Sequence, residues 1–329
     1  MPDLINVGGQ AVLEGVMMRA PRSMTVAVRV PSGEIVLRKD PLKLMADRYP
    51  FLKWPVLRGT VTLFSSLGLG MKALSFSANC QIEAEEKSKK EAAGPEAAKC
   101  GPDSKDAKKE KPLSDLAMAG TMTLSIVLGL GLFFYLPLLL TQLMKDILPI
   151  TQASSIAFNL VDGVIRILIF IAYIFAISRM KDIRRVFEYH GAEHKTIYAY
   201  EAGEEVTVAN ARKYSTLHPR CGTSFLLIVM VLSILVFSLI PKASPFYIKA
   251  ASRLVLIPVI AGLSYEFIKF SAKKRGSRVM AALIAPGLWL QKLTTREPDD
   301  EQIEVAVRAL MEAIQMEKDN AEVANCLAS

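Results

Sequence analysis

The chain has 329 residues, of which 51% are hydrophobic, and its formal net charge is +8. A mean hydropathy of +0.30 is too apolar for an ordinary soluble domain, so the composition indicates a membrane protein. The four cysteines have no CxxC spacing and no disulfide framework, and the first twenty residues lack the apolar run of a cleavable signal peptide.

Residues 1–55 are predicted to form a β-rich polar segment. Met24 to Val30 alternates and is rich in β-branched residues, Pro31 to Gly33 supplies turn residues, and the strand pattern resumes at Glu34. Two such runs around a short turn predict a β-hairpin.

A glycine-rich stretch, Gly8 to Arg19, precedes this hairpin. Glycine permits close backbone approach or a positive φ, but no Lys-Ser/Thr pair follows, so the stretch is not a P-loop. One interpretation is a strand and turn with no chemistry. The other places Gln10, Glu14 or Arg19 against the histidine site described below.

Residues 56–79 have an uncharged centre of about a dozen residues, which is short for a span of roughly 20. We predict an interfacial or re-entrant helix that does not cross the membrane. Residues 80–115 are rich in Lys, Glu, Ala, Pro and Gly and lack aromatic residues, which predicts a disordered linker.

Four apolar stretches follow, each close to the length of a transmembrane helix. They are residues 116–141, 156–178, 223–240 and 251–270. The connection 179–222 carries eight Lys and Arg residues, and a further basic run follows residue 270. The positive-inside rule therefore places 179–222 and both termini in the cytoplasm.

All three histidines of the chain lie in this connection, at positions 190, 194 and 218. His190 and His194 are four residues apart and share one face of a helix, as does Glu193, three residues after His190. Two imidazoles at this spacing can bind one metal ion, with a carboxylate beside it to accept a proton from water.

The rest of the connection offers further ligands. Lys181 to Glu201 is predicted to form a helix that ends near Gly203, with Glu201 on the histidine stripe as a candidate ligand. His218 and Cys221 lie three apart in a turn before the third span, and the turn could fold back to complete a tetrahedral set. The stretch from His190 to His194 also matches the inverted zincin pattern H-x-x-E-H.

A purely structural interpretation stays open, because paired histidines can simply bind backbone carbonyls or lipid phosphates, and a lone cysteine is usually a small core residue. If a metal binds, four protein ligands would indicate a structural site and an open position would indicate chemistry.

Charges inside the apolar stretches are costly and normally face the bundle interior. Asp162 and Arg166, four residues apart, are interpreted as a self-compensating pair rather than part of a transport pathway. Glu266 either reaches the histidine site or extends to the membrane interface.

The segment 271–329 is predicted to form interfacial and amphipathic helices. Val279 to Leu293 suits the interface. Asp299 opens a soluble helix that is expected to dock on the cytoplasmic portion. Its predicted apolar stripe consists of Ile303, Val307, Leu310, Met311 and Ile314.

Three motifs resemble the hallmarks of the YqhQ-type family of bacterial membrane proteins. They are Gly8-Gly9-Gln10-Ala11-Val12 with Glu14-Gly15-Val16-Met17-Met18-Arg19, His190-Gly191-Ala192-Glu193-His194-Lys195-Thr196, and His218-Pro219-Arg220-Cys221-Gly222-Thr223-Ser224-Phe225. The resemblance covers most of the chain. It implies a membrane location, a joint role for the three motifs and a metal-dependent enzyme.

The expected fold is thus an α-helical membrane bundle of about four transmembrane helices plus one interfacial or re-entrant helix, with a small cytoplasmic α+β portion. The first functional hypothesis is a metal-dependent hydrolase with zinc as the expected cofactor. His190, His194, His218 and Cys221 are the metal ligands in this hypothesis, and Glu193 is the general base.

The second hypothesis is a non-enzymatic scaffold or biogenesis factor for membrane proteins, and a transporter is a distant third. The expected location is the cell membrane, in multiple passes. Membrane lipids are the expected partners, with other membrane proteins or a second copy of the chain left open, and no nucleic acid.

Overall fold

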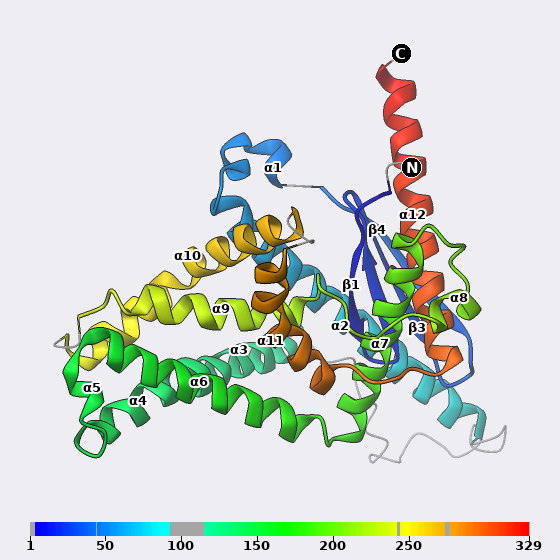
Figure 1. Cartoon of the computed structure of the whole chain (residues 1–329). Helices are drawn as coiled ribbons and strands as arrows, with labels where there is room; N and C mark the ends of the chain where they lie inside the picture. Colours follow the sequence, from blue (N-terminus) through cyan, green and yellow to red (C-terminus); the bar gives the residue numbers. More distant parts are fainter. Residues whose placement is uncertain (1–3, 44, 93–114, 242–243, 274–276, 329) are drawn as a thin grey trace.

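The computed structural model describes residues 4–43, 45–92, 115–241, 244–273 and 277–328. Its helices are arranged in two regions (Figure 1). We call the first the sheet domain, made of the four strands with α7, α8 and α12. The second is the helical bundle, made of α3 to α6 with α9, α10 and α11, and α2 extends along both.

Four strands form an antiparallel sheet in the order β1-β2-β3-β4. They are β1 Gly8–Val12, β2 Gly15–Arg19, β3 Ser23–Arg29 and β4 Ile35–Pro41. The predicted hairpin is β3 and β4, and Gly33 in its turn has a φ of 89°, which glycine adopts without strain. The glycine-rich stretch forms the other hairpin, β1 and β2.

Helices cover both faces of the sheet. On one face Val16, Met18 and Ala27 pack against α7 (Lys181–Glu201) and α12 (Asp300–Ala328). On the other face Met17 and Val26 pack with Ala73 of α2. Successive residues of a strand point to opposite faces, so the helices on both sides of the sheet explain why nearly all residues of β2 and β3 are buried.

Helix α2 spans Leu57–Ala92 and is longer than the 56–79 predicted for it. The prediction of a disordered linker was therefore wrong for residues 80–92, which continue the helix. Gln, Glu, Ala and Lys are strong helix formers, and several of these residue types are also enriched in disordered segments. The remaining linker residues, 93–114, lie outside the described residues.

The remaining elements include two short segments before α2, which are α1 (Met45–Arg48) and η1 (Pro50–Lys53). The rest of the helical set is α3 Asp115–Leu130, η3 Gly131–Tyr135, α4 Leu136–Leu143, η4 Met144–Asp146, α5 Ile150–Ala153, α6 Ser155–Ile177, α8 Val208–Arg212, α9 Gly222–Phe237, α10 Phe246–Lys273 and α11 Arg278–Thr294.

Four helical segments are long and apolar enough to cross a membrane. They are Leu57–Ser88, Thr123–Asp146, Ser155–Ile177 and Phe246–Ser271. Three of them correspond to predicted spans. The third predicted span, 223–240, is the shorter helix α9, and α2 is instead the remaining helix that is long and apolar enough to cross a membrane.

The predicted pair in the second apolar stretch is part of a larger buried cluster. Asp162 binds Arg166 at 2.6 Å and Arg253 at 2.7 Å, and Arg253 also donates to Asn159 at 3.1 Å. Arg166 donates to Ser233 at 2.8 Å. The pairing hypothesis was correct but incomplete, because Arg253 lies on a different helix, 91 residues away from Asp162.

Helix α12 docks on the sheet domain, as predicted. Asp299 and Gln302 form a reciprocal capping box at its start, with hydrogen bonds of 3.0 and 2.8 Å. Ile303 and Leu310 of the predicted stripe are fully buried, whereas Met311 is exposed. The buried face of α12 points away from Met311. Alanines on this face are small enough to allow close packing against the strands.

Candidate metal centre and cavity

Helix α7 carries most of the candidate residues. It begins after Met180 and ends at Glu201, where Gly203, with a φ of 76°, closes the last turn by donating to the Tyr200 carbonyl at 3.0 Å. The bounds match the prediction. The rings of His190 and His194 lie on the same face, with centroids 4.4 Å apart.

The turn before α9 folds back onto this face. Cys221 is the N-cap of α9, and its Sγ lies 3.2 Å from Nε2 of His190. One ligand atom from each of His190, His194 and Cys221 lies within 4.8 Å of the other two. The structure therefore brings together three of the four residues predicted as metal ligands.

The second ring nitrogen of each α7 histidine contacts a backbone carbonyl. Nδ1 of His190 lies 2.8 Å from the Thr294 oxygen, and Nδ1 of His194 contacts the Thr216 oxygen. In each ring, an Nδ1–H donated to the carbonyl leaves the lone pair on Nε2, which is the tautomer that binds a metal through Nε2.

The environment of His194 suits a ligand. Its Nε2 is buried and has no hydrogen-bond partner among the described groups. Burial lowers the pKa of His194, while the adjacent Cys221 thiol acts in the opposite direction. A neutral, buried imidazole with an unused lone pair fits a metal, because a metal ligand must be deprotonated.

Glu193 lies beside the three ligands and is buried. Burial raises the pKa of its carboxyl group, whereas His190, His218 and the Gly9 N–H act in the opposite direction. A Cβ on Gly9 would lie 2.8 Å from Cγ of Glu193, so β1 can approach this side chain only with glycine there. The first motif thus packs directly on the second.

Gly191 has a similar role on the adjacent side of α7. A Cβ at this position would lie 2.0 Å from the Arg296 carbonyl oxygen. This close approach lets the segment after α11 cross the helix, where the Arg296 N–H donates to the Phe187 carbonyl at 2.9 Å. The same segment supplies the Thr294 carbonyl that orients His190.

His218 lies next to the three-atom cluster rather than within it. Its ring centroid is 5.6 Å from that of His194 and 4.5 Å from that of Tyr198. Glu201, the other candidate from the α7 stripe, forms an ion pair with Arg220 and lies 3.6 Å from Nε2 of His218. Metal ligation by His218 or Glu201 stays a prediction.

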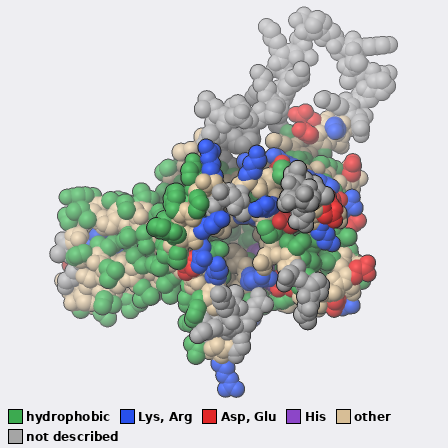
Figure 2. Space-filling view, turned by 90° about the horizontal axis from the view of Figure 1, so that it is seen from above, with side chains coloured by type: hydrophobic (Ala, Val, Ile, Leu, Met, Phe, Trp, Pro, Cys, Tyr) green, Lys and Arg blue, Asp and Glu red, His purple; other side chains and the backbone are tan. Residues whose placement is uncertain are grey.

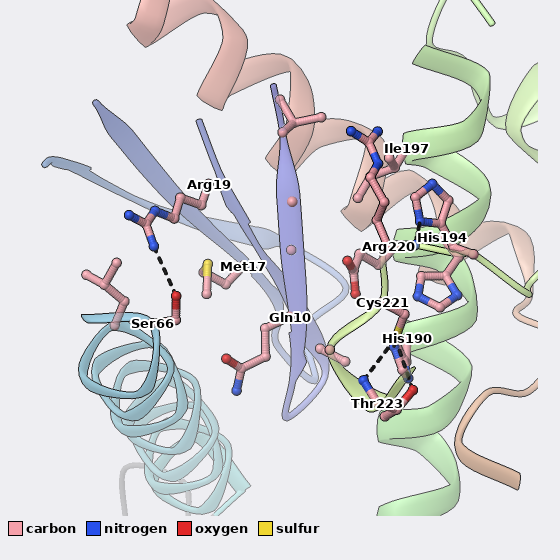
Figure 3. Close-up of a pocket in the computed structure, with 18 of the residues that line it drawn as sticks. Gln10, Met17, Arg19, Ser66, His190, His194, Ile197, Arg220, Cys221 and Thr223 are labelled. Atoms are coloured by element: carbon pink, nitrogen blue, oxygen red, sulfur yellow. Dashed lines mark hydrogen bonds between the residues drawn. The ribbon is translucent and has the colours of Figure 1, made fainter. Parts of the chain in front are cut away.

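The remaining candidates separate into two groups. Gln10 and Arg19 line the same cavity as the histidines but face α2, where Arg19 donates to Ser66 (Figure 3). Glu14 lies in the β1–β2 turn and pairs with Arg185 of α7. Glu266 pairs with Arg58 of α2. The structure thus places Glu14 and Glu266 in contacts between elements, away from the cavity lining.

The three motifs line a cavity of about 1020 Å³ at the junction of the two regions. Its walls come from β1, β2, α2, α7, α10 and the start of α9. Figure 2 shows a hollow here, bordered by Lys and Arg side chains, between the apolar surface of the bundle and the mixed charges of the sheet domain. The ligand atoms are therefore open to a space that could hold a small molecule.

The family model that describes a protein of unknown function, DUF1385, matches residues 54–316. The chain belongs to the DUF1385 family. The uncharacterized protein YqhQ of Bacillus subtilis (strain 168) is 34% identical over 311 residues, which is 94% of this chain and 92% of that protein. This confirms the resemblance stated from the motifs. No solved structure matches the chain.

In this DUF1385 chain, sequence reasoning missed Gln291 of α11. Its side chain accepts from the His218 N–H at 2.8 Å and donates to the His218 carbonyl at 2.7 Å and to Ser224 at 2.8 Å. Gln291 is completely buried and fixes the turn that carries His218 and Cys221. The available signal was a glutamine directly after the apolar run Leu288 to Leu290.

Proposed function

We propose that this protein is a metal-dependent hydrolase that works at the inner face of the cell membrane. The observation that carries the proposal is the convergence of three ligand atoms, from His190, His194 and Cys221, at the wall of a large cavity. Three protein ligands with access to a cavity leave a coordination position open, which is the arrangement of a catalytic rather than a structural zinc site.

Two imidazoles and one thiolate form a donor set that suits zinc. Cys221 sits at the N-terminus of α9, where the helix dipole favours a negative charge. The two carbonyl contacts hold the rings in place, so little ordering would accompany binding. When bound, the metal would polarise water or a substrate oxygen as a Lewis acid.

Glu193 would move the proton in this reaction. Its carboxyl group is next to the ligands and is held by the Gly9 N–H rather than by a cationic partner. Burial raises its pKa toward the working range of a general base, since a base is most effective when its pKa lies near the ambient pH. Glu193 would accept a proton from the attacking water and pass it to the leaving group.

The arrangement of the two regions supports the proposed membrane placement. The α4–α6 end of the bundle lies opposite the sheet domain, and β1 and α12 are both on the sheet-domain side (Figure 1). With the basic connection inside, the sheet domain and both termini are cytoplasmic. In the same proposal α2 stays at the interface, because its second half packs on the sheet through Ala73 and Gln81 donates to the Arg29 carbonyl at 2.8 Å.

Cysteine labelling tests this topology. In a chain without its native cysteines, an impermeant reagent added outside intact cells should label a cysteine at Ser154 and spare one at Ser215. Labelling at Ser215 from the outside would reverse the orientation. Membrane lipids are the partners in this arrangement, and other membrane proteins or a second copy of the chain are compatible with it.

Elemental analysis tests the metal. Protein purified without chelators should contain about one zinc per chain, and His190→Ala and His194→Ala should each contain none. Glu14→Gln is the control, since Glu14 pairs with Arg185 on the same helix, away from the ligand atoms. Stoichiometric metal in His194→Ala would exclude this site.

Glu193→Gln tests the chemistry. Glutamine keeps the length of the side chain but removes its basicity, so we expect normal accumulation and metal content with a rate loss of roughly 10²–10⁴-fold. The readout is complementation of a strain that lacks the gene. The matched control is Glu188→Gln on the same helix, where the carboxylate binds Gln302 of α12 and not the cavity.

The alternative is a scaffold in which the histidines hold the fold together. The contacts of His190 with Thr294 and of His194 with Thr216 favour it, because they connect α7 to the ends of two other segments. A scaffold needs no base, so Glu193→Gln with full metal content would then complement the deletion. That outcome would reject the hydrolase.

A further inference from the structure

The cavity has a second polar wall, away from the metal ligands. Arg19 of β2 and Gln10 of β1 point toward α2, on the other side of β1 from the histidines (Figure 3). Ser66 of α2 and Tyr265 of α10 complete this wall. These residues belong to the first motif and to two apolar helices, and the proposed reaction uses none of them.

Arg19 differs from the other arginines around the cavity. Arg220 is paired with Glu201, and Arg58 and Arg185 also contact carboxylates. Among the described residues the Arg19 guanidinium has no carboxylate partner: it donates a hydrogen bond of 3.1 Å to the Ser66 hydroxyl and interacts electrostatically with Tyr265. Most of its five N–H donors are therefore available, in a partly buried place where an anion would be little screened by water.

Apolar side chains also line the cavity. Met17 of β2, Leu69 of α2 and Leu226 of α9 are among them, and α2 is long and apolar enough to cross a membrane. Leu67 and Phe64 of α2 are exposed nearby along the same helix. A ligand that fits has an anionic group for Arg19 and an apolar chain.

We propose that Arg19, with Gln10 beside it, binds the phosphate group of an anionic amphiphile, and that this amphiphile is the substrate class of the enzyme. Arginine suits this role because its planar fork can donate two parallel hydrogen bonds to a phosphate. The substrate part of the inference rests on the proposed hydrolase. There, water splits one bond of the amphiphile near the ligand atoms, and its OH and H join the two fragments.

Binding to metal-free protein tests the inference separately from the reaction. Octyl phosphate is titrated into the full-length chain in maltoside micelles by calorimetry, with octanol and inorganic phosphate as comparison ligands. Octyl phosphate should bind at least about tenfold more tightly than either, because only it satisfies both the cation and the apolar wall. If inorganic phosphate binds as tightly as octyl phosphate, the site binds free anions, and the proposal of an amphiphilic ligand is overturned.

Arg19→Gln should weaken octyl phosphate binding at least about tenfold and leave the binding of octanol unchanged. The affinity of Arg19→Lys for octyl phosphate should lie between those of the wild type and Arg19→Gln, because lysine keeps the charge but lacks the two parallel donors of a guanidinium. The control is Lys72→Gln, which removes an exposed charge from α2 outside this cavity and should bind as the wild type does. Octyl phosphate also partitions into the micelles, but this partition is the same for all variants and does not affect their comparison.

The outcomes separate the two proposals. Unchanged octyl phosphate binding in Arg19→Gln overturns this inference whatever the metal analysis gives. If octyl phosphate binding depends on Arg19 but Glu193→Gln complements the deletion with full metal content, the binding site stands and the hydrolase is rejected. If Arg19→Gln does not accumulate, the wild-type comparison of the three ligands and the Arg19→Lys variant still decide the matter.

Discussion

The bundle and the sheet domain each contain a buried polar cluster, and the two are built differently. In the bundle, both carboxylate oxygens of Asp162 bind a guanidinium, and the arginines also donate to Asn159 and Ser233. At the candidate metal centre, one atom each of His190, His194 and Cys221 lie close together, and His194 Nε2 has no hydrogen-bond partner among the described groups. In the first cluster the opposite charges are paired with one another, although Nε of Arg166 and Nε of Arg253 have no hydrogen-bond partner among the described groups. Within the part of the chain that the structure describes, the second cluster contains no such ion pair and lines a cavity.

The surroundings explain the difference. Charges inside an apolar bundle lose their hydration, so they persist only when they are paired or packed on aromatic rings. Arg166 and Arg253 lie 5.0 and 5.1 Å from the centre of the same ring, Phe237. The cluster of His190, His194 and Cys221 borders a cavity instead. Four substitutions test this contrast, beginning with the largest expected change in stability.

Asp162→Asn should destabilise the protein most. It leaves two buried guanidinium groups without a counter-charge, which typically costs roughly 3–5 kcal/mol. Denaturant unfolding in micelles measures the loss, and Asp146→Asn, at an exposed position beside the bundle, should be neutral. A loss below about 1 kcal/mol for Asp162→Asn would contradict the importance of these buried ion pairs.

Gly191→Ala should destabilise the protein by about 1–3 kcal/mol, the usual cost of overpacking. The new methyl group would meet the Arg296 carbonyl oxygen at 2.0 Å. Gly68→Ala in α2 is the control, because nothing lies within 4 Å of its Cβ position and alanine favours a helix. The same unfolding experiment compares them, and equal stability of the two variants would refute the close approach.

Cys221→Ser should change the stability of the metal-free protein by less than about 1 kcal/mol. Cys221 caps α9 through the Thr223 N–H, and serine is a good N-cap residue. Zinc affinity should nevertheless fall by at least about a hundredfold, since a thiolate ligand is lost. A chelator competition assay measures the affinity. Unchanged zinc affinity would remove Cys221 from the site.

Glu14→Gln should have the smallest effect. The Glu14–Arg185 ion pair is partly exposed, and such pairs contribute roughly 0–1 kcal/mol. The metal content should stay the same, because Glu14 is absent from the cavity wall. Loss of metal in this variant would show that the β1–β2 turn controls the site more directly than its contacts suggest.

The sequence by itself determined the local structure of the site. The bounds of α7 and the shared face of His190 and His194 follow from helix periodicity and a C-terminal glycine, which involve residues a few positions apart. The hairpin of β3 and β4 and the existence of long apolar helices were likewise predictable. These features rest on backbone hydrogen bonds and apolar periodicity within one segment.

Only the tertiary structure decided which residues meet. Cys221 joins His190 across 31 positions, and Arg253 joins Asp162 across 91. Glu193 packs on Gly9, and Arg19 faces α2, although the first motif alone left both Gln10 and Arg19 as candidates beside the histidines. Such pairings depend on how whole helices pack on a sheet, and packing free energy is shared among many residues. No single motif therefore encodes the partner of each side chain.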